Sequence, residues 1–266
     1  AVESYMDWKE TTDGETETVS EYATTRHVDQ ALDWLSAQQG PWFLWLALTA
    51  PHTPLHLPPA DLHTYSELSG TAEDIEANGP AYFRAMIQAM DTEIGRLFAG
   101  IGEEQLENTL VIYVGDNGTS GTLIEPPYQQ NRAKGSLHQG GIHVPLVIAG
   151  PGIYAAPRRT SALAHMVDLF ATILDTAGAS SMSIPPNVEI DGASLWPVLD
   201  GSKDSVRDWM LSELFGNAAP NKAGKTARDE RYKLIGLESG AQRFYDLEVD
   251  PYEEVQLDRN SLEPDV

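Results

Sequence analysis

The chain has 266 residues, of which 41% are hydrophobic and 21% charged, which is typical of one large folded domain or of a domain with a smaller companion. Its 17 lysine and arginine residues against 40 aspartate and glutamate residues give a net charge of −23. A chain this acidic repels nucleic acid and anionic membranes, so we expect neither as a partner. The lack of cysteine excludes disulfides, thiolate metal ligands and a cysteine nucleophile within the chain.

The first part of the chain predicts a loop, a helix and a strand. Residues 1–23 are acidic and rich in threonine, without periodicity, which indicates a loop. Apolar residues at helical spacing predict a helix over 24–39. The run WFLWLALT, residues 42–49, is almost wholly apolar and predicts a strand that is buried on both faces.

Later segments alternate between helices and apolar strands. The pattern predicts a helix after Pro80, strands over 109–114 and 144–150, and a helix that Ser161 caps and Gly178 ends. Such alternation indicates an α/β fold with a mostly parallel sheet flanked by helices. Residues 232–237 and 242–247 predict a hairpin in a smaller α+β subdomain that begins near residue 205.

Targeting and membrane segments are not expected. The first residues, AVESYMDWKE, contain neither a basic region nor an apolar one, so we expect no signal peptide within them. Its apolar runs are shorter than the roughly 18 residues that a membrane-spanning helix needs.

Polar residues follow two of the predicted strands. Two prolines flank His52 after the first, and Asp116, Asn117 and Gly118 follow the second. Ligands of such sheets bind beyond the carboxyl ends of the strands. The carboxylate and amide suit Ca²⁺ or Mg²⁺, although Asp-Asn-Gly is also common turn chemistry.

The histidines allow more than one interpretation. The flanking prolines favour rigid presentation of His52 to a ligand, whereas a single histidine is more often a packed or capping residue. His56 and His63 follow in the same stretch and could extend a site, but we expect them to be exposed loop residues.

Lys134 lies in the stretch NRAKGSLHQGGIHVPLVIAG, which leads directly into the third predicted strand. A lysine there could contact an anion bound at the strand ends. The alternative is an ordinary surface lysine in a loop. A metal pair, an imidazole and an ammonium group would together suit an anionic ligand.

Six blocks of the chain resemble, in order, blocks of the type I sulfatases, which hydrolyse sulfate esters and belong to the alkaline-phosphatase-like superfamily. The blocks read APHTP, DNGTSGT, KGSLHQGGIHVPLVIAGPG, HMVDLFATILDTAGA, DGASLWPVL and ERYKLIGLESGAQRFYDLEVDPYEEVQL, and the match as a whole runs from about residue 24 to 258. The resemblance implies a partial α/β core domain over 1–203 and an antiparallel-sheet subdomain over 204–266.

The resemblance also implies roles for single residues. Asp116 and Asn117 match calcium ligands, and Lys134 and His52 match residues that contact the sulfate group. His143 stands where an arginine is usual and is the third expected substrate-binding residue, while Gln139 stands where a glutamate is usual. The ligand would be a small sulfate ester or a sulfated sugar, and export to the periplasm or out of the cell is expected.

The family's nucleophile has no counterpart in this sequence. Family members carry a Cys- or Ser-x-Pro-Ser-Arg segment, whose first residue becomes formylglycine, and this chain contains neither a cysteine nor such a segment. The resemblance therefore begins beyond that portion. We expect a partial enzyme that needs its N-terminal portion, or a second copy of the chain, beside it.

Two other functions stay open. A phosphate mono- or diester hydrolase of the same superfamily would use several Asp and His ligands for two transition metals. A non-catalytic protein could bind a sulfated ligand or a partner without cleaving it.

Overall fold

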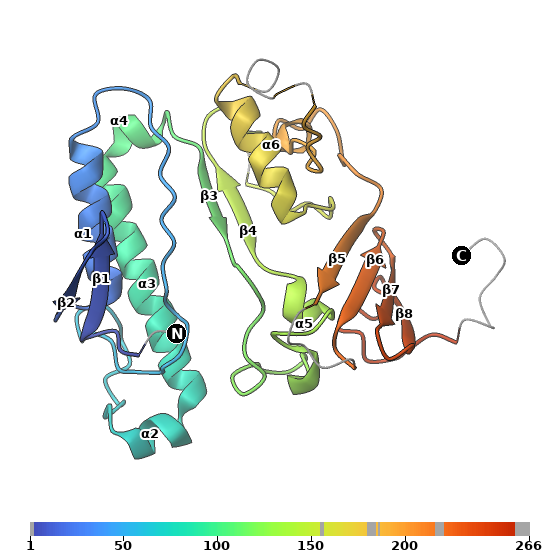
Figure 1. Cartoon of the computed structure of the whole chain (residues 1–266), viewed down its shortest axis with the longest axis horizontal. Coiled ribbons are helices and arrows are strands. Elements are labelled where there is room, and N and C mark those ends of the chain that lie inside the picture. The colour runs from blue at the N-terminus through green and yellow to red at the C-terminus, as the bar shows by residue number, and fades with distance from the viewer. Residues whose placement is uncertain (1–2, 155–156, 180–184, 186, 216–220, 259–266) are drawn as a thin grey trace. The chain divides into compact units, whose positions relative to one another are not determined.

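The computed structural model describes residues 3–154, 157–179, 185, 187–215 and 221–258. The chain divides into two compact units, residues 1–108 and 109–266, which are described one at a time below (Figure 1). The expected domain boundary at 203/204 stays a prediction. None of the helices in the described residues has the length and apolar character needed to cross a membrane.

The first unit opens with a β-hairpin where a loop was predicted. Strands β1 (Trp8–Thr12) and β2 (Glu15–Val19) pair in antiparallel register. Asp13 and Gly14 form the turn between them with positive φ values of 51° and 87°. An Asp-Gly pair favours the type of turn that joins hairpin strands, so the prediction of a loop over 1–23 was wrong.

Helices α1 (Ala23–Ser36) and α3 (Gly79–Ile101) confirm the two predicted helices of this unit. They lie side by side, with the short helices α2 (Ala72–Ala77) and α4 (Glu103–Leu106) at the two ends of α3 (Figure 1). Val28 and Ala31 of α1 pack against Leu97 of α3. This contact forms part of the core of the unit.

Residues 42–49 are extended, but no strand of the first unit pairs with them. Leu44, Leu46 and Leu48 pack against the α1–α3 core, whereas Phe43 and Trp45 are 61% and 79% exposed. The prediction of a strand buried on both faces was therefore wrong. Within this unit the helices cover one face of the segment, and the described residues provide no layer for the other.

Acid should weaken the first unit through Asp74. The Asp74 carboxylate accepts hydrogen bonds from the Tyr82 hydroxyl at 2.6 Å, the Ser69 amide at 2.8 Å and the Asn78 side chain at 2.5 Å. These donors hold the pKa of Asp74 below its usual 3.8, with the Tyr82 bond contributing most. The stabilisation is therefore complete above pH 3.8 and is lost as the pH falls towards the lower pKa of the folded state.

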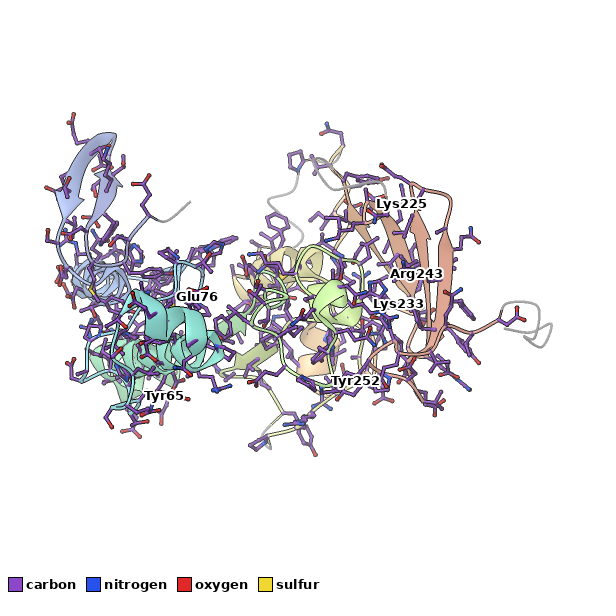
Figure 2. All side chains as sticks on the ribbon, turned by 90° about the horizontal axis from the view of Figure 1, so that it is seen from below. Tyr65, Glu76, Lys225, Lys233, Arg243 and Tyr252 are labelled. Atoms are coloured by element: carbon purple, nitrogen blue, oxygen red, sulfur yellow. The ribbon has the colours of Figure 1, made fainter. Side chains whose placement is uncertain are left out.

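The change Asp74→Asn removes this carboxylate, so we expect the thermal midpoint to fall less steeply below pH 4 than in the unchanged protein. Thermal unfolding followed by circular dichroism between pH 2 and 7 measures the effect. The control is Glu76→Gln, which neutralises an exposed carboxylate on the same helix (Figure 2). If the thermal midpoint falls equally steeply below pH 4 in the two variants, Asp74 is not the source of the acid sensitivity.

The second unit begins with β3 (Val111–Val114), which pairs with β4 (Leu146–Ala149). The pairing is antiparallel, and so is every other strand pairing in the described residues. For these strands the prediction of mostly parallel pairing is therefore corrected. Between β3 and β4 the chain forms η1 (Gln130–Arg132) and α5 (Gln139–Ile142), and it then runs back beside β3 in the opposite direction.

Helix α6 (Met166–Thr176) begins five residues after the predicted cap at Ser161. His165 caps it instead, because its side chain accepts a hydrogen bond from Val167 while Asp168 reaches back to the His165 amide. A short helix, α7 (Trp196–Leu199), follows. Both belong to the α/β unit that β3 and β4 begin.

The chain ends in a four-stranded antiparallel sheet with the order β5-β6-β7-β8 (Figure 1). Strands β7 (Tyr232–Leu237) and β8 (Gln242–Asp246) confirm the predicted hairpin. Strands β5 (Met210–Leu214) and β6 (Gly224–Arg228) complete the sheet. Ile235, Leu237 and Tyr245 form its core with Leu137, which brings the loop before α5 onto this sheet.

Candidate functional site

His52 is exposed on the loop that follows the extended segment. Its Nδ1 lies 2.8 Å from the carbonyl oxygen of Thr53. Because a carbonyl can only accept a hydrogen bond, Nδ1 carries the proton, and Nε2 is the nitrogen that remains for a ligand.

Two tyrosines pack against this loop. The Tyr5 hydroxyl donates a 2.8 Å hydrogen bond to the His52 carbonyl, and the Tyr5 ring stacks on His56 at 4.3 Å. The His56 Nε2 lies 3.3 Å from the Tyr22 hydroxyl. His56 is thus a packed residue, which corrects its expected place as an exposed loop histidine, and burial lowers its pKa.

Asp116 and Asn117 follow β3, as predicted, and both are exposed. The Asn117 amide nitrogen donates a 2.7 Å hydrogen bond to the Asp116 carboxylate. Two neighbouring oxygen donors, a carboxylate and an amide, therefore stand at the end of one strand. They fit a hard cation such as Ca²⁺ as part of its ligand set.

Gly118 lets this turn approach the segment before β4 very closely. Its amide donates a 2.9 Å hydrogen bond to the Gly141 carbonyl, and a Cβ at position 118 would lie 1.9 Å from the carbonyl oxygen of Gly140. Only glycine allows two backbones to come this near. The Asp-Asn-Gly sequence is therefore more than a turn, because it forms part of a contact between two loops.

Lys134 and His143 lie at the two ends of the segment that Gly118 contacts. The Lys134 amide donates a 2.9 Å hydrogen bond to Thr119, and the His143 amide donates a 2.9 Å hydrogen bond to Gln139 of α5. Both side chains are exposed. Within the second unit, backbone bonds thus join the loops that carry Asp116, Asn117, Lys134 and His143, while His52 belongs to the first unit.

Sequence reasoning missed a buried polar cluster beside α5. Lys233 of β7 forms a 2.6 Å ion pair with Glu253, and the two side chains are 0% and 1% exposed. The other Glu253 oxygen accepts a 2.7 Å hydrogen bond from the Gln139 amide, and Lys233 donates a 3.3 Å hydrogen bond to the Gln139 side chain. Burial lowers the pKa of Lys233 to about 8, although Glu253 opposes the change.

His138 extends this cluster towards β8. Its Nε2 accepts a hydrogen bond from Arg243 at 3.2 Å, and its ring lies against Tyr245. Burial, with the charges of Lys233, Arg132 and Arg243, lowers the pKa of His138 to about 3, so it is neutral. One signal was readable in the sequence: Lys233 shares a strand face with the apolar Ile235 and Leu237.

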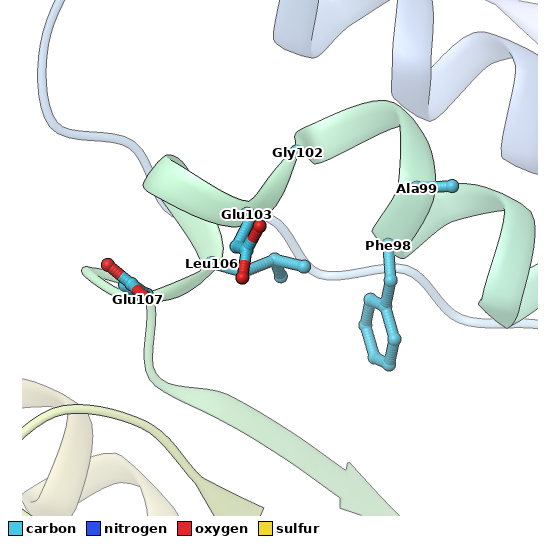
Figure 3. Close-up of a pocket in the computed structure, with 6 residues that line it drawn as sticks. All are labelled: Phe98, Ala99, Gly102, Glu103, Leu106 and Glu107. Carbon is cyan, nitrogen blue, oxygen red and sulfur yellow. The ribbon is translucent and has the colours of Figure 1, made fainter.

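Other features of the described residues add no further site. These residues contain no group of three or more His, Cys, Asp and Glu side chains able to hold a metal ion. A hollow in the first unit is lined by the end of α3 and by α4 (Figure 3). Its two carboxylates, Glu103 and Glu107, would repel an anionic ester.

Comparison with known proteins decides the family. The sulfatase family model matches residues 2–179, which is more than half of the chain. The chain belongs to the sulfatase family. A second model, the C-terminal part of N-sulphoglucosamine sulphohydrolase, matches residues 132–263 of this sulfatase chain.

Curated relatives agree with this assignment. The sulfatase chain is 26% identical to arylsulfatase G of Rattus norvegicus over 233 residues, which are 82% of the chain and 41% of the relative. It is 29% identical to arylsulfatase K of Mus musculus over 223 residues, which are 79% of the chain and 37% of the relative. The chain thus spans about two fifths of the length of these relatives.

Solved structures agree on the fold. A protein crystallised with its substrate D-glucosamine-2-N,6-O-disulfate matches with a TM-score of 0.71 and 20% identity, covering 94% of the sulfatase chain and 68% of that protein. At this identity the match shows the fold alone. The chain has the α/β, alkaline-phosphatase-like fold of its structural neighbours, as predicted.

Proposed function

We propose that this chain is part of a calcium-assisted sulfatase that hydrolyses sulfate esters of sugars. The observation that carries the proposal is the pair of loop contacts, Gly118 to Gly141 and Lys134 to Thr119, which join two exposed oxygen donors to an exposed lysine. Family membership supplies the reaction class. The solved neighbour that holds a sulfated glucosamine suggests the substrate class.

Each residue has a distinct part in this proposal. The Lys134 ammonium group neutralises the sulfate oxygens, and His143 contacts the same group. Because the Nδ1–H of His52 donates to the Thr53 carbonyl, its Nε2 is the nitrogen that contacts the sulfate group or its bridging oxygen. Asp116 and Asn117 would hold the Ca²⁺, which when bound polarises the sulfate as a Lewis acid.

The nucleophile and the remaining calcium ligands would come from polypeptide outside this chain. The sequence contains no cysteine for conversion to formylglycine. Phe43 and Trp45 in the first unit, and Tyr113 and Val147 on β3 and β4 in the second, are exposed apolar residues on extended segments. In this proposal an N-terminal portion of the enzyme covers these faces and completes the site.

The test is ligand binding, because the chain contains no cysteine and no Ser-x-Pro-Ser-Arg segment that could provide the formylglycine nucleophile. D-glucosamine-2-N,6-O-disulfate, titrated calorimetrically with Ca²⁺ present, should bind, and chelation of Ca²⁺ should weaken the binding. Lys134→Ala should raise the dissociation constant about 10- to 100-fold, because a charge-assisted hydrogen bond contributes about 1.5–3 kcal/mol. Lys203→Ala, at an exposed lysine of the same unit, is the control.

Two results would count against the proposal. Equal dissociation constants for Lys134→Ala and Lys203→Ala would remove Lys134 from the site. Tighter binding of the corresponding phosphorylated sugar than of the sulfated one would favour a phosphate ester hydrolase instead.

A further inference from the structure

The ion pair between Lys233 and Glu253 joins the end of the chain to the candidate site. Figure 2 labels Lys233 on the C-terminal sheet, and its partner Glu253 lies 20 residues further along the sequence. Both members of the pair hydrogen-bond to Gln139: Glu253 accepts from its backbone amide, and Lys233 donates to its side-chain oxygen. Gln139 is the first residue of α5, so these two hydrogen bonds fix the start of that helix.

The contacts of α5 lead from Gln139 to the site residues. The Gln139 carbonyl accepts the hydrogen bond of the His143 amide, and the Gly141 carbonyl, two residues on from Gln139, accepts the bond of Gly118. Gly118 directly follows the Asp116–Asn117 pair. A shift of Gln139 would therefore move both His143 and the metal-binding turn.

The backbone at Glu253 supports a specific role for its carboxylate. Glu253 has a φ of 60°, in the left-handed region that non-glycine residues seldom adopt. Asp250 holds this turn, since its carboxylate accepts hydrogen bonds from the amides of Glu254 and Val255. An unfavourable backbone conformation is thus maintained where it brings one buried carboxylate to both Lys233 and Gln139.

We propose that Glu253, fixed by Lys233, is a positioning residue: it holds the start of α5, and through α5 it sets the places of His143 and of the Asp116–Asn117 turn. The part that concerns ligand binding rests on the proposed function. The mechanical part does not, because it concerns the contacts of Gln139, Gly141 and Gly118 alone.

Three variants separate positioning from stability. Glu253→Gln keeps an oxygen for the Gln139 amide but removes the charge. Glu253→Leu removes the acceptor. Lys233→Met with Glu253→Leu removes both charges and replaces the pair by apolar side chains, which often restores stability at a buried ion pair.

The hydrogen-exchange rates of the amides of Gly118, Gly141 and His143 report whether their hydrogen bonds stay closed, and the measurement needs no ligand. We expect Glu253→Gln to keep these amides protected to within about threefold. Glu253→Leu should speed their exchange about tenfold or more, because it leaves the buried Gln139 amide without an acceptor. The double variant should regain the thermal midpoint but not the protection.

The proposal is overturned if the double variant regains both the midpoint and the protection, because the pair would then only stabilise the fold. It is also overturned if Glu253→Leu leaves the three amides unchanged. Binding of Ca²⁺ and of D-glucosamine-2-N,6-O-disulfate by the unchanged protein is measured beside this. If the unchanged protein binds neither, this chain alone does not form the calcium and ester sites of the proposed function, while the exchange data still decide the positioning role.

Discussion

Replacing Lys233 by methionine is expected to lower the free energy of unfolding by about 3–5 kcal/mol, because it leaves a buried carboxylate without its countercharge. Lys233 and Glu253 are 0% and 1% exposed, so water cannot compensate for the lost partner. The Gln139 side chain would lose its hydrogen bond from Lys233 as well. Denaturant unfolding of the variant and of the unchanged protein, followed by circular dichroism, measures the difference.

Lys225 provides a matched control on the same sheet (Figure 2). It forms a 2.5 Å ion pair with Glu213, but the two side chains are 60% and 39% exposed. Solvent and salt screen such a pair, so Lys225→Met should cost only about 0–1 kcal/mol. If both variants lose the same small amount, the buried pair does not have the environment described here.

Gly118→Ala is expected to lower the free energy of unfolding by about 2–3 kcal/mol and to displace the Asp116–Asn117 turn. The added Cβ would lie 1.9 Å from the Gly140 carbonyl oxygen, which belongs to the backbone and cannot rotate away as a side chain can. The two loops must separate to admit it. Calcium affinity, measured by titration calorimetry, should fall together with stability.

Gly236→Ala is the control for this change. Gly236 lies in β7 of the same unit, and a Cβ there would have no atom within 4 Å. Alanine should therefore be tolerated, or even stabilise the strand by up to about 1 kcal/mol, because glycine loses more backbone entropy on folding. An unchanged stability in Gly118→Ala would show that the two loops can separate at no cost.

Periodicity was a sound guide to the helices and to the last hairpin. The apolar stripes of α1 and α3 face one another across a shared core, so their spacing in the sequence follows directly from packing. The hairpin of β7 and β8 was also predictable, since β7 alternates between buried and half-buried residues and a short Glu-Ser-Gly turn joins it to β8.

Apolar runs were a poorer guide to the strands. Residues 42–49 contain few polar side chains, which suggests two buried faces, yet Phe43 and Trp45 stand on a face that the unit does not cover. Sequence alone cannot distinguish a face buried within a unit from one that awaits another layer. The antiparallel pairing of β3 with β4 was equally hidden, because it depends on how the long connection between them folds.

Some residues of the candidate site and of the cluster beside it can be found from the sequence, and others cannot. The sequence indicates Asp116 and Asn117 as candidates because they follow a strand, and Lys134 because of the glycine-rich stretch around it. Glu253 was not, since its bond to Gln139 joins residues that are 114 positions apart. Contacts over such distances depend on the folded chain, and short sequence patterns do not record them.

The open apolar face of residues 42–49 also affects how the protein behaves in solution. The leucines of the segment pack against the core of the unit, while Phe43 and Trp45 are exposed. The unpaired backbone of the segment could therefore pair with a strand of another copy of the chain. The net charge of −23 keeps copies of the chain apart at low ionic strength. Salt shortens the range of that repulsion to about 8 Å at 0.15 M, so the chain should be most soluble in dilute buffer and should aggregate as salt is added.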